Sequence, residues 1–140
     1  MVHAPYTCLW FSSEADEAAE YYCSVFNDSE LVSTSPIVSI FRLSETKFMA
    51  LNGRTGDDFN ESASIVVECD TQEEIDQLWD TLTEEGEESM CGWLRDKYGV
   101  SWQIVPSILG TLMSDPERGQ RVVQAFLQMR KFDIAALLNA

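Results

Sequence analysis

The stretch CGWLRDKYGVSWQIVP, residues 91–106, decides the fold of this chain. Apolar and aromatic residues dominate residues 90–96 and 100–105, and Lys97–Gly99 between them has the composition of a turn. Two apolar segments around a short glycine-containing turn predict an antiparallel strand pair. The pair closes at Pro106, because proline has no N–H to continue a strand ladder.

The second strand of this pair separates polar from aromatic side chains. Because successive side chains of a strand point to opposite faces, Ser101 and Gln103 share one face and Trp102 lies on the other. Trp102 is predicted to belong to the core. Gln103 carries donors and an acceptor that neighbouring protein groups, water or a ligand must satisfy, and the sequence leaves these alternatives open.

The same order of elements is predicted twice before Pro106. Helical spacing predicts a first helix over residues 14–26, with Ser13 as its N-terminal cap. Residues 37–43 and 46–52 then have the alternation and composition of paired strands.

The pattern restarts after a polar, glycine-containing loop at residues 52–62. Residues 62–69 are predicted to form a strand, and Asp70 or Thr71 to cap a second helix that Gly86 closes. A strand, a helix and further strands thus occur twice. This duplication predicts an α+β fold built from two similar modules.

Beyond Pro106 the chain is predicted to be helical. Ser114 or Asp115 caps one helix, and Asp133 starts a final short helical turn. The apolar faces of these helices must pack against another surface, and a dimer interface is one candidate. We expect residues 1–140 to form a single domain with a first module (5–53), a second module (62–106) and a C-terminal helical extension (107–140).

The charge of the chain restricts its partners. It carries 24 acidic and 9 basic side chains, a net charge of −15. This sign repels nucleic-acid phosphates and anionic lipids, so neither nucleic acid nor a membrane is an expected partner. The acidity is typical of a soluble protein, with adaptation to high salt as the alternative. The first residues lack a basic start followed by a long apolar run, and we expect a cytoplasmic protein.

The thiols do not form a recognisable metal motif. Four cysteines occur without a CxxC pair, and His3 is the only histidine. A zinc site made of Cys and His therefore has almost no ligands to draw on. We expect free and mostly buried thiols at Cys8, Cys23, Cys69 and Cys91.

Four segments carry a resemblance to a known family. They are LWF (9–11), FMALNG (48–53), VVECD (66–70) and, above all, residues 91–106, and the likeness extends through the helical tail at 121–137. Together they resemble the PhnB-like branch of the vicinal-oxygen-chelate superfamily, which includes glyoxalase I, dioxygenases and bleomycin-resistance proteins. The resemblance implies paired βαβββ modules that form a curved, partly closed mixed sheet, followed by C-terminal helices. It also implies a homodimer.

Proteins of this branch often carry a 3-demethylubiquinone-9 3-methyltransferase label. A doubly wound methyltransferase needs a glycine-rich turn after a strand, set in a large parallel sheet. No such glycine pattern occurs in the sequence, and the chain is short for that fold. We therefore do not expect methyl transfer.

Metal-using members of the superfamily place ligands on the first and last strands of each module, and the resemblance implies the corresponding positions. Gln103 stands where a glutamate is expected, and its counterpart in the first module is about Leu51. Ser64 stands where many relatives carry histidine, and the opening strand offers Tyr6 or Thr7. An amide and a hydroxyl are weak ligands and leucine has no donor, so we expect neither a metal nor another cofactor.

The groove between the predicted sheets is then expected to bind a small molecule. Two indoles beside convergent polar groups are typical of such a pocket. The candidate ligand-binding residues are Trp10, Leu51, Ser64, Glu68, Trp93, Ser101 and Gln103. The acidic run at residues 84–88 is interpreted as a solvated helix end, with a cation-attracting rim as the alternative.

These observations favour a metal-free small-molecule-binding protein, and we assign no catalytic residue. One alternative is a metal-dependent lyase, isomerase or dioxygenase, which needs a Lewis acid and a base near the substrate. Another is a structural or regulatory dimer whose cavity is filled by its own side chains.

Overall fold

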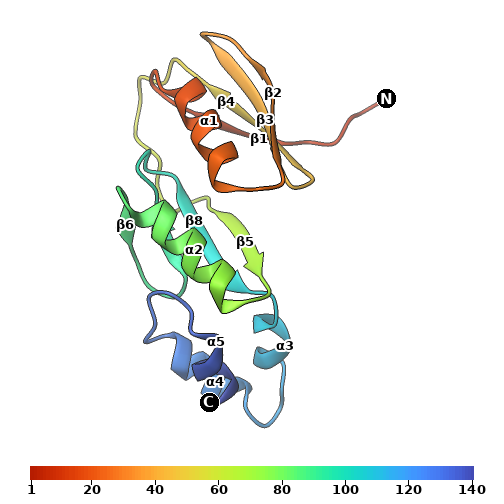
Figure 1. Ribbon diagram of the computed structural model, residues 1–140, viewed down its shortest axis with the longest axis vertical. Coiled ribbons are helices and arrows are strands. Elements are labelled where there is room, and N and C mark those ends of the chain that lie inside the picture. The colour runs from red at the N-terminus through yellow and green to blue at the C-terminus, as the bar shows by residue number, and fades with distance from the viewer. The chain divides into compact units, whose positions relative to one another are not determined.

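The computed structural model describes all 140 residues and contains two compact units, Met1–Asp57 and Asp58–Ala140 (Figure 1). Each unit holds one open four-stranded sheet with a helix packed on one face. The strand order is β1-β4-β3-β2 in the first sheet and β5-β8-β7-β6 in the second. This shared topology confirms the α+β fold of two similar modules. That the units together form a single domain remains a prediction.

The first unit follows the predicted elements closely and adds one strand. Its elements are β1 (Thr7–Trp10), α1 (Ala15–Val25), β2 (Ser29–Thr34), β3 (Val38–Leu43) and β4 (Thr46–Leu51). β1 runs parallel to β4, and the other pairs are antiparallel. β2 was not predicted, because it lies at the sheet edge and most of its side chains are exposed. An edge strand of this kind lacks the apolar alternation that a half-buried strand shows.

The second unit repeats this arrangement with shorter strands. It contains β5 (Ile65–Cys69), α2 (Gln72–Thr83), β6 (Glu87–Glu88), β7 (Trp93–Arg95) and β8 (Ser101–Pro106). The predicted strands 62–69 and 90–96 are both shortened at their beginnings. Cys91 and Gly92 adopt positive φ angles of 59° and 81° and turn the chain before β7. β6 was not predicted, since two glutamates carry no strand pattern.

Aromatic side chains fill the space between each helix and its sheet. In the first unit Tyr22, Phe41 and Phe48 stack in sequence, with ring centroids 5.9 and 5.3 Å apart. In the second unit Trp79 of α2 and Trp102 of β8 are both almost completely buried. The predicted core position of Trp102 is thereby confirmed.

The two helices begin in different ways. α2 has the capping box that the sequence indicates: the Thr71 hydroxyl accepts from the Glu74 N–H, and the Glu74 carboxylate accepts from the Thr71 N–H. The predicted cap of α1 at Ser13 is wrong, because no side chain of that turn caps the helix. The Oδ1 atom of Asn52, remote in sequence, accepts a 2.8 Å hydrogen bond from the Ala15 N–H instead.

The C-terminal extension contains three short helices, α3 (Leu109–Met113), α4 (Gly119–Phe126) and α5 (Ile134–Leu138). The Asp133 carboxylate caps α5 as predicted, since it accepts from the Ala136 N–H. Asp115 instead closes a turn, and α4 begins later than the sequence suggests. No helix of the protein has the length and apolar character needed to cross a bilayer.

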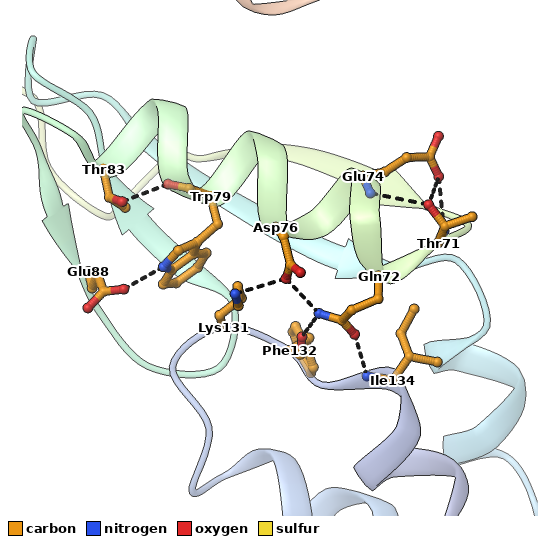
Figure 2. Close-up of polar contacts among 10 residues, drawn as sticks. All are labelled: Thr71, Gln72, Glu74, Asp76, Trp79, Thr83, Glu88, Lys131, Phe132 and Ile134. Atoms are coloured by element: carbon orange, nitrogen blue, oxygen red, sulfur yellow. Dashed lines mark hydrogen bonds and ion pairs between the residues drawn. The ribbon is translucent and has the colours of Figure 1, made fainter.

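The segment before α5 is fastened to α2 by side-chain contacts (Figure 2). The Gln72 Nε2 atom donates to the Phe132 carbonyl over 2.8 Å, and its Oε1 atom accepts from the Ile134 N–H over 2.8 Å. Lys131 Nζ lies 2.8 Å from Asp76 Oδ1. Hydrogen bonds from Lys131 and, to a lesser extent, from Gln72 lower the pKa of the Asp76 carboxyl below its ordinary value. The Gln72 side chain thus forms hydrogen bonds with two backbone groups of the tail.

The same segment packs against the turn before β7. The Gly92 N–H donates to the Arg130 carbonyl over 2.8 Å, and the Cys91 N–H donates to the Met129 carbonyl over 2.7 Å. A Cβ atom at Gly92 would lie 2.4 Å from Cε2 of Phe132. The Phe132 ring is buried, so the turn and the ring leave no space for a side chain at residue 92.

We predict that Asn52→Ala lowers the free energy of unfolding by about 1–2 kcal/mol, because it removes the cap of α1 and a bond to the Pro36 carbonyl. Chemical denaturation followed by circular dichroism measures this change. The matched control, Ser13→Ala, should stay within about 0.5 kcal/mol of the parent protein. A larger loss for Ser13→Ala than for Asn52→Ala would contradict the observed cap.

We predict that Gln72→Ala loosens the tail and lowers the free energy of unfolding by about 1–3 kcal/mol, because two part-buried backbone groups lose their partner. Amide hydrogen exchange of the Ile134 N–H should become faster. Gln77 lies exposed on the same helix, so Gln77→Ala is the control and should leave that exchange unchanged. Unchanged exchange in Gln72→Ala would show that other contacts hold the tail.

Candidate functional site

The second sheet has one face that α2 does not cover. Gln103 of β8 lies opposite Val66 of β5 and Trp93 of β7 in the strand registers. Residues that lie opposite each other in a sheet project to the same face. Trp93 and Gln103 are half-buried and Val66 is exposed, whereas their neighbours Leu94 and Trp102 are buried under the helix. Trp93 and Gln103 therefore stand side by side on the open face of the second sheet.

The turn between β7 and β8 holds this arrangement in place. Asp96 is only 3% exposed, and its carboxylate accepts from the N–H groups of Tyr98 (2.8 Å) and Val100 (3.1 Å). It also accepts a 2.8 Å hydrogen bond from Nε1 of Trp102. Gly99 completes the turn with a φ of 89°, which glycine adopts without strain. Asp96 and Gly99 thus stabilise the turn between β7 and β8.

Gln103 and Ser64, two of the predicted ligand-binding residues, contact each other. The Gln103 Nε2 atom donates to the Ser64 hydroxyl over 3.0 Å. Of the partners that the sequence leaves open for Gln103, a neighbouring protein side chain accepts from its amide nitrogen. No group of the chain donates to Oε1 of Gln103. The amide is held in one orientation with its acceptor oxygen available on the open face.

Trp93 and Ser101 line a small hollow that lies entirely within the second unit. Its volume is about 130 Å³, and its lining also includes Arg95 and the carboxylates of Glu61, Glu87 and Glu88. Ser101 is 2% exposed, and its hydroxyl has no hydrogen-bond partner in the chain. Sequence reasoning found the serine and the indole, and it noted Glu87 and Glu88 as part of the acidic run with a cation-attracting rim as the alternative, but it missed Glu61 and Arg95.

The carboxylates around the hollow differ in their partners. Arg95 Nη2 lies 3.1 Å from Glu61 Oε1. Glu88 accepts a 2.6 Å hydrogen bond from Nε1 of Trp79 (Figure 2). Its Oε2 atom lies 3.6 Å from Nη1 of Arg130. Glu87 has no ion-pair partner. The acidic run is thus only partly the predicted solvated helix end, because Glu87 and Glu88 form β6 and border the hollow.

The first sheet also has an open face, but its side chains are mostly apolar. Trp10 lies opposite Leu51, and Cys8 lies opposite Met49. Trp10 is 46% exposed, which is unusual for an indole. Thr7 lies opposite the buried Phe48, so the open-face residues of the opening strand are Cys8 and Trp10 rather than Thr7, and Tyr6 precedes the strand.

The remaining predicted residue, Glu68, is exposed and lies opposite Val105 on the open face of the second sheet. It stands one step along the sheet from the pair formed by Val66 and Gln103. It forms no hydrogen bond or ion pair with the other predicted residues. The structure therefore groups the predicted residues by sheet: Trp10 with Leu51, and Ser64, Glu68, Trp93, Ser101 and Gln103 on the second sheet.

All four cysteines are free, as expected, but only Cys69 is buried. Burial, reinforced by the nearby carboxylates of Glu74 and Asp70, raises the pKa of the Cys69 thiol to about 11. Partial desolvation raises the pKa of the Cys8 thiol above its ordinary value, although the residue is largely exposed. The expectation of mostly buried thiols is wrong, and the raised pKa values indicate little thiolate at neutral pH.

The donors on the two open faces do not suit a divalent cation. The first face offers the Cys8 thiol, whose pKa partial desolvation raises, beside the hydrocarbon of Leu51. The second offers the Ser64 hydroxyl and a Gln103 amide that is hydrogen-bonded to it. Nowhere do three His, Cys, Asp or Glu side chains gather so that they could hold an ion. Hard cations require several anionic or carbonyl oxygens, and thiolates rather than thiols bind soft ones.

The family match and the similarity to PhnB place the protein in the PhnB-like branch of the vicinal-oxygen-chelate superfamily. The chain belongs to the family described as 3-demethylubiquinone-9 3-methyltransferase, whose model matches residues 4–105. The PhnB protein from Bacillus cereus, which carries the same label, is 33% identical with a TM-score of 0.69; the match covers 74% of this chain and 99% of that one. The recognised resemblance is thereby confirmed.

More distant structures share the fold alone. Protein PA1353 from Pseudomonas aeruginosa is 18% identical with a TM-score of 0.63, over 75% of this chain and 98% of that one. The fosfomycin resistance protein FosX from Listeria monocytogenes, in complex with Mn(II) and sulfate, is 11% identical with a TM-score of 0.60, over 80% and 96%. No curated protein matches the chain. The family match ends at Val105, so it does not support the expected likeness through the helical tail.

We predict that Asp96→Asn lowers the free energy of unfolding by about 1.5–3 kcal/mol, because one of three buried N–H groups then faces an amide donor. Chemical denaturation followed by tryptophan fluorescence measures the loss. Asp57→Asn, in the exposed loop, is the control and should shift the value by less than about 0.5 kcal/mol. Equal effects of the two substitutions would contradict a structural role for Asp96.

Proposed function

We propose that this protein binds a small organic molecule on the open sheet faces and does so without a metal ion. The observation that carries the proposal is the fixed Gln103 amide, whose Oε1 acceptor is available beside the Trp93 indole. A preoriented polar group next to an aromatic surface is the usual composition of a small-molecule site. Trp10 and Leu51 supply a second apolar surface on the first sheet.

The donor chemistry supports independence from metal. Relatives of the same fold include Mn(II)-bound FosX, but the likeness at 11% identity concerns the fold only. In this chain the Ser64 hydroxyl accepts from the Gln103 amide, the Oε1 atom of Gln103 is a neutral oxygen, and Leu51 offers no donor. We therefore propose a binding protein rather than a metal-dependent lyase, isomerase or dioxygenase.

The methyltransferase description of the family is not the activity that we propose. A doubly wound methyltransferase carries its cofactor at a glycine-rich turn of a large parallel sheet. Both sheets of this protein have four strands with mainly antiparallel pairing. Small-molecule binding makes use of the open faces that the fold does provide.

Two further parts of the proposal concern the assembly and location of the protein. We propose a homodimer, because Met113, Leu127 and Leu138 of the helical extension are exposed apolar side chains that a second copy would cover. The proposal of a cytoplasmic location rests on the sequence alone.

We predict that a thermal-shift screen of metabolites and antibiotics identifies compounds that raise the melting temperature saturably, since a ligand stabilises the folded state as its concentration exceeds Kd. Gln103→Leu should fold but lose this stabilisation, because the available acceptor is removed. Gln77→Leu, on the exposed side of α2, is the control and should keep it.

Two outcomes would overturn the proposal. Stoichiometric zinc, nickel, manganese or iron in the purified protein, with a chelator abolishing turnover of a substrate, would establish a metal enzyme. Severe unfolding of Gln103→Leu, together with no stabilising compound for the parent protein, would make Gln103 a structural residue only.

A further inference from the structure

The hollow beside Trp93 has a distinct chemical character. Its lining combines an indole, that of Trp93, with the Ser101 hydroxyl and the acidic residues Glu87 and Glu88. At about 130 Å³ it is smaller than the pockets that enclose whole drug-sized ligands. It has the size for one functional group of a ligand.

The charge of the hollow favours a cation. The carboxylates of Glu61, Glu87 and Glu88 face the single guanidinium of Arg95, which is paired with Glu61. Arg130 lies 3.6 Å from Glu88, and Glu87 has no such partner. An indole face attracts a positive charge, and a carboxylate accepts hydrogen bonds from an ammonium group.

Ser101 indicates independently that the hollow receives a polar group. Its side chain is 2% exposed, it lines the hollow, and no group of the chain bonds to its hydroxyl. The hydroxyl oxygen still reaches the hollow, where it can exchange a water partner for a ligand group. A ligand N–H group in the hollow would supply the missing partner.

We infer that the hollow binds the ammonium group of a small organic amine, with Trp93, Ser101 and Glu87 as its contacts. This inference rests on the proposed function and names the chemical class of the ligand. The rest of the amine would extend over the open face towards Gln103, which lies opposite Trp93. The hollow then selects ligands that carry a positive charge, and the open face selects among them by shape.

Three probes of equal chain length test the inference: butylammonium, 1-butanol and butyrate. Each is titrated into ¹⁵N-labelled protein, and chemical shifts of the Trp93 indole N–H and the Ser101 amide report binding in the hollow. We expect butylammonium to shift both signals saturably, 1-butanol to do so much more weakly and butyrate not at all. Added NaCl should weaken butylammonium binding, since the rim is exposed to solvent.

Three variants test the assigned contacts. Trp93→Leu should weaken butylammonium binding about five-fold and Glu87→Gln about three-fold. Ser101→Ala should also weaken it while leaving stability unchanged, because it removes a buried hydroxyl that has no partner in the free protein. Glu84→Gln removes the same charge outside the hollow, and it should keep the parent affinity.

The outcomes separate this inference from the proposed function. Equal binding of 1-butanol and butylammonium, shifts that leave Trp93 and Ser101 unaffected, or absence of butylammonium binding would each overturn the ammonium site. If neutral compounds still stabilise the parent protein but not Gln103→Leu, the proposed function stands while the ammonium site fails. If neither butylammonium nor any neutral compound binds, the ammonium site and the proposed function are both contradicted.

Discussion

The arrangement of the second unit depends on one buried carboxylate. Asp96 binds two backbone N–H groups of its own turn and the indole N–H of Trp102, so it joins the turn to the core. A buried charge is tolerated only where such donors surround it. Because Trp102 is held on the helix side, the alternation of β8 places Ser101 and Gln103 on the opposite face. The candidate site is therefore a consequence of how this turn is closed.

The elements that could be predicted are those whose signals are local. The periodicity of α1 and α2, the Thr71 capping box and the strands around Asp96 all lie within short windows of sequence. The edge strands β2 and β6 were missed because exposed strands carry no alternation. The cap of α1 was missed because its partner, Asn52, is far along the chain.

The candidate site was predictable in part, for a similar reason. Strand alternation alone places Ser101 and Gln103 on one face, and register supplies Trp93. The contact between Gln103 and Ser64 and the carboxylates of the hollow depend on how separate segments meet. The two modules share a topology, yet the open face of the first is largely apolar and that of the second is polar. The polar side chains of the open faces are thus concentrated in the second module.

The close approach of Phe132 to Gly92 has a consequence for how such chains diverge. The family match ends at Val105, so the segment that carries Phe132 is an addition to the shared part. Any homologue that keeps this aromatic ring against the turn must keep glycine at the matching position. A homologue without the tail is released from that steric demand, although the positive φ of the turn still favours glycine there. The two positions should consequently co-vary, and substitutions at the turn should be found in chains that lack the ring.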